Sequence, residues 1–272
     1  LNFKGASWDS LFLTFVKIVT TLSTIILTKM LSTGLSLGEY GTYSQAIIVI
    51  SIGSSFVILG MGDALNFFYN KHDRGSQEER ISFVNTIYFI EIILGIILAS
   101  GIILLRPIIS DYFSNNALGA VLVIVAIKPM LDNMMALYQV LYVSVGKAKI
   151  IAIRNFVVVV LKLALMYLSI YVFKSIIAIF LSLLFIELLQ LVFFAVFFAK
   201  ESFWVNPFRF SPKKIIPILS YGLPMGVFAL TSVLSRDIDK LVVGRLTDSE
   251  TLAIYTNCSK ILPFDIISAF RI

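Results

Sequence analysis

Nine ionisable side chains lie within long apolar stretches of this 272-residue sequence. Such a side chain inside a membrane is costly, so its presence usually reflects binding, transport or charge pairing. The nine are Lys17, Glu91, Lys128, Asp132, Lys162, Glu187, Arg236, Asp237 and Asp239. They supply cations that suit an anionic ligand, and carboxylates that could carry a proton or neutralise a cation.

Lys17 and Arg236 are the two residues that we expect to bind substrate. They belong to the opening helices of two repeated units described below, so they are predicted to face one cavity from opposite sides. Two cations at such a place suit a phosphate or diphosphate. Lys128 and Lys162 are weaker candidates for the same cationic cavity, and Lys240, nearer the outer interface, is expected to snorkel.

The carboxylates are expected to serve ion coupling or internal pairing. Lys128 and Asp132 are four residues apart, so they are predicted to neutralise each other on one helix face. Lys162 and Glu187 lie at comparable depth on adjacent spans and could pair there, whereas Glu91 has no local partner. The candidates for coupling or pairing are Glu91, Asp132, Glu187 and Asp239.

A stripe of polar residues runs along one face of the first apolar segment, at spacings of four and three residues. It comprises Ser10, Thr14, Lys17, Thr21, Thr24 and Thr28. One interpretation is that Thr14, Thr21, Thr24 and the repeat-related Ser232 line a cavity. The other is helix packing, because hydroxyl side chains are common at helix contacts in membranes. Lys17 favours the cavity, since a buried amine needs a partner or water.

The helices that must position these side chains can be read from composition. The sequence is 58% hydrophobic and only 14% charged, whereas about a quarter of a soluble domain is charged. Apolar stretches of about 20 residues predict eight spans: 8–31, 44–68, 81–105, 117–143, 150–173, 175–199, 215–243 and 253–272. They are too long for membrane strands and do not alternate in polarity, so we expect an all-α integral membrane protein.

Charge between the spans predicts the orientation. With the N-terminus in the cytoplasm, the inside segments carry eleven Lys and Arg residues and the outside segments carry four. All these loops are short, so the positive-inside rule applies to them. We therefore expect a multi-pass membrane protein with a cytoplasmic N-terminus and membrane lipids around it, and the family resemblance given below implies the bacterial cytoplasmic (inner) membrane.

An internal repeat predicts the domain organisation. The segment from Leu31 to Tyr43 is matched by that from Leu246 to Tyr255, with three residues of difference in the loop. The same alignment places Lys17, Thr21 and Thr24 on Ser232, Arg236 and Asp239. We expect two pseudo-symmetric lobes of six helices each in a parallel repeat: an N-terminal lobe at 1–199, a cytoplasmic amphipathic linker at 200–214, and the start of a C-terminal lobe at 215–272.

Chain ends, glycines and prolines add further expectations. The chain begins with Leu1 and stops inside an apolar stretch, so the second lobe is expected to be truncated after about two helices. Phe173-Lys174-Ser175 predicts a tight hairpin between spans five and six. A hinge that breaks span seven is predicted at Gly222, Pro224 and Gly226, and Pro129 falls inside span four.

Several short motifs resemble one known family. They are Lys29-Met30-Leu31-Ser32, Glu39-Tyr40-Gly41-Thr42-Tyr43-Ser44, Leu59-Gly60-Met61-Gly62-Asp63-Ala64, Gly146-Lys147-Ala148-Lys149, Tyr221-Gly222-Leu223-Pro224 and Arg236-Asp237-Ile238-Asp239-Lys240 followed by Tyr255. Together they resemble the bacterial polysaccharide flippases of the multidrug/oligosaccharidyl-lipid/polysaccharide exporter superfamily. The first outer loop, Ser32 to Gly38, is longer than is usual in that family.

The resemblance implies two six-helix lobes around a central cavity. It also implies that the protein flips an undecaprenyl-diphosphate-linked oligosaccharide from the cytoplasmic to the outer leaflet by alternating access. Cationic cavity residues would then attract the diphosphate and acidic sugars, a role that transfers to Lys17 and Arg236. H⁺ or Na⁺ is the expected coupling ion, no other cofactor is expected, and a polysaccharide polymerase and a chain-length regulator are the implied protein partners.

Other functions stay open at this point. A lipid II-type flippase or a drug/cation antiporter would share the superfamily, although the latter favours an acidic cavity. A membrane polymerase or ligase would need a cluster of acid, base or metal-binding residues in a sizeable loop, and the single histidine, His72, lies in a charged turn. The lone Cys258 excludes an internal disulfide, no metal-binding motif occurs, and no basic stripe suits nucleic acid. We therefore expect no enzymatic activity.

Overall fold

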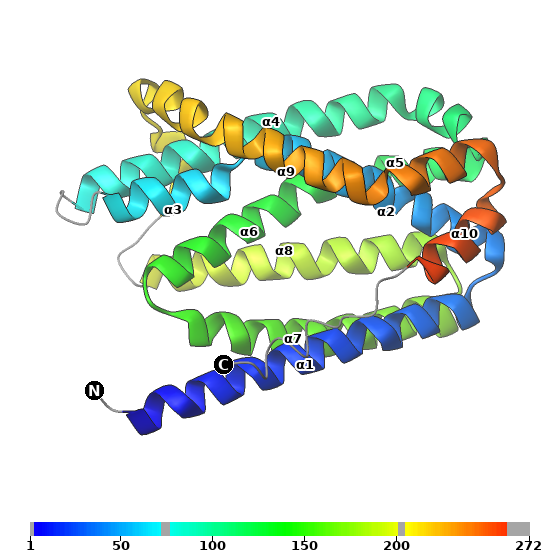
Figure 1. The fold of residues 1–272 in the computed structure, drawn as a ribbon, viewed down its shortest axis with the longest axis horizontal. Coiled ribbons are helices and arrows are strands. Elements are labelled where there is room, and N and C mark those ends of the chain that lie inside the picture. Colours follow the sequence, from blue (N-terminus) through cyan, green and yellow to red (C-terminus); the bar gives the residue numbers. More distant parts are fainter. Residues whose placement is uncertain (1–2, 72–76, 201–204, 260–272) are drawn as a thin grey trace.

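The computed structural model describes residues 3–71, 77–200 and 205–259, and they form helices joined by short connections (Figure 1). The helices are α1 (Phe3–Gly34), α2 (Leu37–Ile58), α3 (Met61–Lys71), α4 (Gln77–Tyr112), α5 (Asn116–Val125), α6 (Lys128–Ser144), α7 (Ala148–Tyr167), the π-helix η1 (Leu168–Val172), α8 (Ile176–Lys200), the 3₁₀ turn η2 (Pro207–Arg209), α9 (Pro212–Leu246) and α10 (Ser249–Cys258). Most run along the long axis of the molecule.

Seven segments within the described ranges are long and apolar enough to cross a membrane. They are Thr14–Gly34, Leu37–Lys71, Gln77–Tyr112, Asn116–Ser144, Ile150–Val172, Ile176–Phe194 and Pro212–Leu246. They correspond to the first seven predicted spans and make the chain a multi-pass membrane protein. Of the eighth predicted span, 253–272, the part up to Cys258 lies in α10, and residues 260–272 lie outside the described residues.

Two of the spans are each built from two helices. α2 and α3 meet at Leu59 and Gly60, whose φ angles of 31° and 70° are left-handed, a conformation in which a residue with a side chain is strained. α5 and α6 meet at Ala126 and Ile127, and Pro129 lies in the first turn of α6, where a missing N–H is tolerated. Pro129 therefore lies inside span four, as predicted, directly after the junction of its two helices.

One predicted connection is shorter in the structure, and another is as predicted. The predicted outer loop from Ser32 to Gly38 is wrong in extent, because α1 runs to Gly34 and α2 begins at Leu37. Ser36 caps α2 in a capping box with Glu39, which stabilises a helix start directly after the turn. The hairpin at Phe173-Lys174-Ser175 is confirmed, since η1 ends at Val172 and α8 begins at Ile176.

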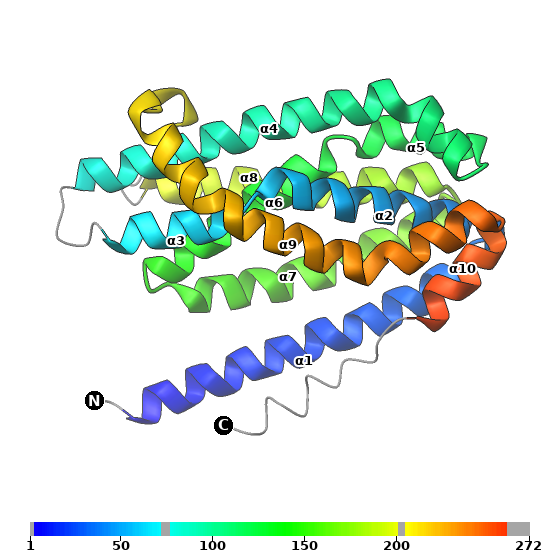
Figure 2. The same cartoon turned by 45° about the horizontal axis from the view of Figure 1, so that its top comes forward.

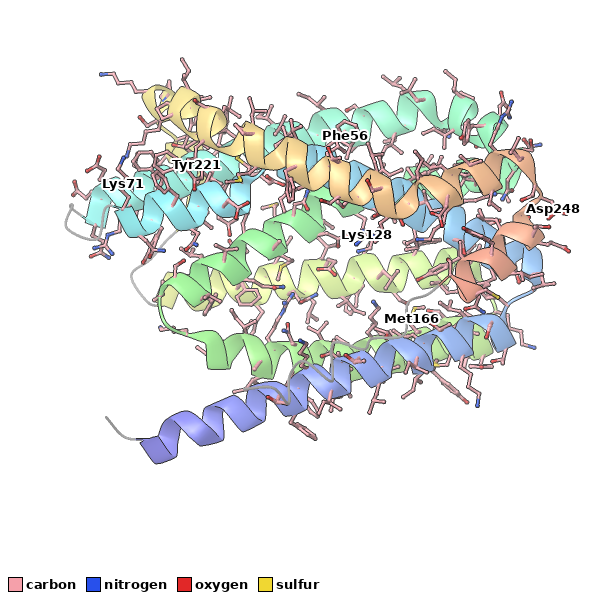
Figure 3. The ribbon with its side chains drawn as sticks, in the orientation of Figure 1. Phe56, Lys71, Lys128, Met166, Tyr221 and Asp248 are labelled. Atoms are coloured by element: carbon pink, nitrogen blue, oxygen red, sulfur yellow. The ribbon has the colours of Figure 1, made fainter. Side chains whose placement is uncertain are left out.

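Two hydrophobic cores fill the bundle. One core contains Leu31, Tyr40, Ile50, Ile102, Leu122 and Phe180; the other contains Met61, Leu65, Tyr88, Leu137, Tyr142 and Phe194. Along α2, α4 and α6 the residues between the two cores include Ser51, Glu91 and Asn133. Figure 3 shows Lys128 at this middle level, with Lys71 and Asp248 at opposite ends of the molecule. The polar residues therefore form a belt across the middle of the bundle.

α9 and α10 pack across the first lobe. α9 contacts α2, α3 and α4, and α10 contacts α2, whereas α1 lies beside α7 on the other side of the bundle (Figure 2). The linker before α9 is anchored on α4. The backbone amide of Asn206 donates to Asn85 Oδ1 at 2.8 Å, and the backbone amide of Ser211 donates to Thr86 Oγ1 at 3.0 Å. The rings of Phe89 and Phe210 stack with their centroids 3.8 Å apart. Residues 205–211 are thus held against α4.

Candidate functional site

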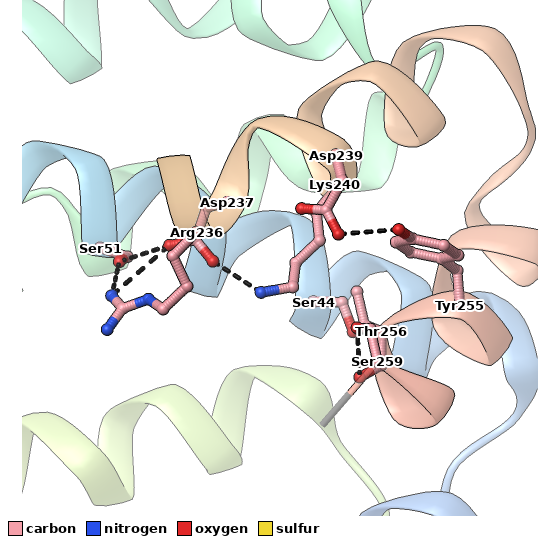
Figure 4. Close-up of polar contacts among 9 residues, drawn as sticks. All are labelled: Ser44, Ser51, Arg236, Asp237, Asp239, Lys240, Tyr255, Thr256 and Ser259. Carbon is pink, nitrogen blue, oxygen red and sulfur yellow. Dashed lines mark hydrogen bonds and ion pairs between the residues drawn. The ribbon is translucent and has the colours of Figure 1, made fainter. Parts of the chain in front are cut away.

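A pocket with several charged lining residues lies where α2, α9 and α10 meet, and we call it the interface pocket. Its volume is about 560 Å³. It is lined by Tyr40, Tyr43, Ser44, Ile47, Ile48, Ser51, Arg236, Asp237, Asp239, Lys240, Thr256 and Ser259. These residues come from segments about 200 positions apart in the chain, and Figure 4 shows the polar contacts among nine residues here.

Asp237 is the centre of this pocket. Its side chain is only 8% exposed, and Lys240 Nζ donates to its Oδ1 at 2.6 Å. Ser51 Oγ, on α2, donates to its Oδ2 at 3.0 Å. A buried carboxylate is stable only when it is paired and hydrogen-bonded, and both conditions are met here. The expectation that Lys240 simply snorkels is therefore wrong, because Lys240 neutralises Asp237.

Arg236 is held much more loosely. Its side chain is 61% exposed, and its Nη2 lies 3.6 Å from Asp237 Oδ2 and 3.4 Å from Ser51 Oγ (Figure 4). A guanidinium has five N–H donors in a planar fork that suits carboxylates and phosphates. Within the described residues these contacts use only Nη2, so most of the Arg236 donors are available to an anion.

At the end of the interface pocket nearest the start of α2, side-chain hydrogen bonds join α2 to α10. Ser44 Oγ lies 3.1 Å from Thr256 Oγ1, and Tyr40 donates to Asn257 Oδ1 at 3.1 Å. A Cβ on Gly41 would come within 2.0 Å of the Ser249 carbonyl oxygen, so only glycine permits this approach. On the same side Tyr255 donates to Asp239 Oδ2 at 2.7 Å, which gives Asp239 an internal partner.

A second pocket, here called the inner pocket, lies within the first lobe among α2, α6, α7 and α8. Its volume is about 320 Å³, and its charged lining residues are Lys128, Asp132, Lys162 and Glu187. Lys128 Nζ pairs with Asp132 Oδ1 at 2.5 Å, which confirms the predicted pair. Lys162 and Glu187 face the same pocket, but Glu187 accepts a hydrogen bond from Gln190 at 3.2 Å.

Arg154 is a functional candidate that sequence reasoning missed. Arg154 is one of the eleven basic residues counted for the inside segments, but the structure places it within the candidate span Ile150–Val172 of α7 and η1. Its guanidinium donates to Gln190 Oε1 on α8 and to Asn155 Oδ1, and it lies 5.6 Å from the centroid of the Phe194 ring. The sequence does indicate this position, since Arg154 has apolar residues on both sides, Ile150–Ile153 before it and Phe156–Leu161 after Asn155.

The structure does not bring Lys17 into either pocket. Lys17 is exposed on α1, whose buried residues Val16, Ser23, Leu27 and Leu31 mark its packed face. α1 packs mainly against α7, whereas Arg236 lies on α9 across the bundle. That Lys17 and Arg236 share one cavity stays a prediction.

The hydroxyls of the predicted stripe are used by their own helices. Thr24 Oγ1 donates to the Thr21 carbonyl at 2.7 Å, and Ser232 Oγ donates to the Phe228 carbonyl at 3.0 Å. Thr14 and Thr21 are half-buried, while the Ser10 side chain lies outside the described part of the structure. These bonds leave the cavity-lining interpretation as a prediction.

The structure shows no break at Gly222, Pro224 and Gly226, because α9 is one continuous helix from Pro212 to Leu246, and a hinge there stays a prediction. The two glycines instead allow α9 to contact the α2–α3 junction. A Cβ on Gly226 would lie 2.5 Å from Leu59 Cα, and one on Gly222 would lie 2.9 Å from the Leu59 carbonyl oxygen. They therefore hold the backbones of two elements together.

Two solved structures share the fold of this chain. The crystal structure of MATE in complex with MaD3S superposes with a TM-score of 0.67 at 14% identity, covering 96% of this chain and 64% of that one. The inward-facing conformation of a multidrug resistance MATE family transporter of the MOP superfamily gives 0.62 at 15% identity, covering 90% and 60%. These likenesses confirm an all-α membrane fold of helical-bundle lobes, and this chain spans less than two thirds of either neighbour.

Sequence comparison assigns the family. No curated protein matches the chain in sequence. Residues 26–269, nearly the whole chain and including both pockets, match the family described as polysaccharide biosynthesis protein. With its apolar spans, its lobed helical fold and this match, the chain belongs to the polysaccharide biosynthesis protein family.

Proposed function

We propose that this chain is part of a transporter that flips an undecaprenyl-diphosphate-linked oligosaccharide repeat unit from the cytoplasmic to the outer leaflet. The observation that carries the proposal is the exposed Arg236 guanidinium at the interface pocket, whose partner Asp237 is already engaged by Lys240 and Ser51. Membership of the polysaccharide biosynthesis protein family supports the same class of substrate.

The chemistry of the interface pocket suits a diphosphate. Arg236 can donate two parallel N–H bonds to phosphate oxygens, a geometry that a lysine cannot offer. Tyr43, Ile47 and Ile48 give the pocket mainly apolar walls beside this cation, and a low-polarity environment strengthens a charge-assisted hydrogen bond. Lys17, exposed on α1, is proposed as a second cation that the substrate meets in another conformation.

Alternating access would require α10 to separate from α2. The direct contacts between Ser44 and Thr256 and between Tyr40 and Asn257 join these two helices at the end of the interface pocket nearest the start of α2. We propose that this is the conformation open toward the cytoplasm. The orientation with a cytoplasmic N-terminus in the bacterial inner membrane follows from the positive-inside rule and is part of the proposal.

A drug/cation antiporter is the second candidate, and one observation favours it. The interface pocket holds two carboxylates, Asp237 and Asp239, and both solved neighbours are MATE proteins, one of them a multidrug resistance transporter. However, Asp237 is neutralised by Lys240 and Asp239 is hydrogen-bonded to Tyr255. A lipid II-type flippase would use the same anion chemistry. We propose no enzymatic role for either pocket.

Complementation of a flippase-null strain tests the proposal. The full-length gene would be expressed as wild type and as Arg236→Ala, Arg236→Lys and Lys17→Ala, with Arg106→Ala as a control for loss of an exposed arginine on α4. We expect surface polysaccharide to fall at least tenfold for Arg236→Ala, to recover partly for Arg236→Lys, and to be unchanged for Arg106→Ala, at equal membrane abundance. Full activity of Arg236→Ala would contradict the assigned anion site.

A further inference from the structure

Glu91 is a carboxyl group buried in the middle of α4, and within the described residues it has no ion-pair partner. Its exposure is 0%, and neither carboxylate oxygen accepts or donates a hydrogen bond. It lies in the polar belt between the two hydrophobic cores, one turn beyond Tyr88, whose hydroxyl is also buried without a hydrogen bond. Neither pocket includes Glu91 among its lining residues.

The elements around Glu91 offer no counter-charge. α2, α3, α5, α6, α9 and the linker turn η2 all pack against α4. Within the described residues, none of their Lys, Arg, Asp or Glu side chains forms an ion pair or a hydrogen bond with Glu91. The titratable neighbour is Tyr88 on α4, whose ring contacts that of Tyr138 on α6, and the polar neighbour is Asn133 on α6.

The amide of Asn133 is partly used elsewhere. Its Nδ2 donates one N–H to the Ser54 carbonyl oxygen on α2 at 2.9 Å, and the remaining N–H can offer Glu91 at most one neutral hydrogen bond, which does not balance the charge of a buried carboxylate. Burial of an unpaired carboxylate is prohibitively costly, and such a group binds a proton instead. A metal cation would need about six or more oxygen ligands, and the described surroundings do not supply them.

We propose that Glu91 is a proton-binding site of the transport cycle, protonated in this conformation and deprotonated when α2 moves relative to α4 and α6. The proposal deepens the proposed function and rests on it. Proton binding changes the charge of the belt by one unit, so it can favour one packing of these helices over another.

One turn of α2 links this site to the interface pocket. Ser54 receives the Asn133 amide beside Glu91 and lines the inner pocket. Ser51, three residues earlier, lines both pockets and donates to Asp237. A substrate that draws Arg236 and Asp237 away from Ser51 would therefore shift the same turn of α2 that encloses Glu91. This contiguous set of contacts gives substrate and proton a common element to act on.

The first test asks for the protonation state without any transport assay. Dicyclohexylcarbodiimide reacts with protonated carboxyl groups in apolar surroundings, and mass spectrometry locates the adduct on the full-length protein in membranes. We expect labelling of Glu91 at pH 7 that falls at least tenfold at alkaline pH, with no labelling of the exposed Glu250. Absence of label on Glu91, or protection by Na⁺ instead of by high pH, would overturn the proposal.

The second test separates coupling from substrate binding. Glu91→Gln is a neutral isostere of the protonated group, so we expect it to fold and to bind undecaprenyl diphosphate as wild type does. In proteoliposomes we expect it to lose at least tenfold of the transport driven by a pH gradient, while Glu250→Gln keeps it. Full gradient-driven transport by Glu91→Gln would overturn the proton site. If the wild-type protein does not bind undecaprenyl diphosphate, the proposed function is overturned instead.

Discussion

The two pockets contain the same kinds of charge but use them differently. In the inner pocket Lys128 is 11% exposed and pairs with Asp132 at 2.5 Å. In the interface pocket the corresponding tight pair is Lys240 with Asp237, and a second cation, Arg236, is left 61% exposed. A cation is available to a ligand when the neighbouring carboxylate is already neutralised by a second cation, as Lys240 neutralises Asp237 beside Arg236. The inner pocket therefore stabilises the first lobe, and the interface pocket can bind an anion between α2, α9 and α10.

The largest effect is expected from locking the interface pocket. Ser44 and Thr256 have hydroxyls 3.1 Å apart on α2 and α10, so cysteines at both positions can form a disulfide. In a Cys258→Ser background, we expect oxidation of this pair to abolish transport and reductant to restore it. The matched control is Ser169→Cys with Ser182→Cys, whose hydroxyls lie 2.7 Å apart within the first lobe.

If the two pockets differ as described, the control disulfide leaves transport intact, because it joins η1 to α8 without crossing the interface pocket. Surface polysaccharide is measured alongside the extent of crosslinking on a non-reducing gel. Undiminished transport by a fully crosslinked Ser44–Thr256 pair would show that α2 and α10 need not separate.

Loss of one charge from the inner pocket is expected to reduce stability. Asp132→Ala leaves Lys128 buried without its partner, and breaking such a pair typically costs about 3–5 kcal/mol. Arg236→Ala removes an exposed side chain and should change stability by no more than about 0.5 kcal/mol. Thermal unfolding in detergent measures both. The double variant Lys128→Met with Asp132→Leu should recover most of the loss, and failure to do so would assign the pair a role beyond pairing.

Much of the fold can be predicted from the sequence, because hydropathy marks each span directly. The seven described spans, the hairpin at Lys174 and the Lys128–Asp132 pair depend on residues near one another in the chain. The polysaccharide-related family suggested by the motifs is confirmed as well. Local spacing cannot predict that Ser51 is a partner of Asp237, because the two residues are 186 positions apart in the chain.

The candidate site was predicted less well than the fold. The sequence predicts that Lys240 snorkels, because it shows the distance of Lys240 from the span centre but not its contact with Asp237. Gly222 and Gly226 indicate a flexible segment when only the sequence is considered. The sequence does not show that the backbone of Leu59 packs against both glycines. The sequence therefore indicates which side chains could bind or pair, but it does not indicate which distant residues contact them.

A smaller effect is expected from separating α9 from α2. In Gly226→Ala the new Cβ would lie 2.5 Å from Leu59 Cα, and backbone cannot move aside as a flexible side chain can. Overpacking of this kind typically costs about 1–3 kcal/mol. Gly101→Ala is the control, because a Cβ there meets nothing within 4 Å. Equal melting temperatures for the two variants would mean that α9 does not need this contact to form the interface pocket.

The smallest effect is expected at the start of α10, a wall of the interface pocket. The Thr251 amide donates to Asp248 Oδ1 at 2.7 Å, and hydrogen bonds from the Thr251 side chain and backbone hold the pKa of Asp248 below its ordinary value. A lowered pKa means that the contribution to stability is present at neutral pH and is lost as the pH falls below about 4. Asp248→Ala should therefore lower the melting temperature slightly at pH 7, while Asp248→Asn, which can also cap a helix, should lower it less. Melting curves measured from pH 7 to pH 3 should show the difference between wild type and Asp248→Asn vanish at the acidic end, and a constant difference would mean that the ionised carboxylate is not what stabilises this wall.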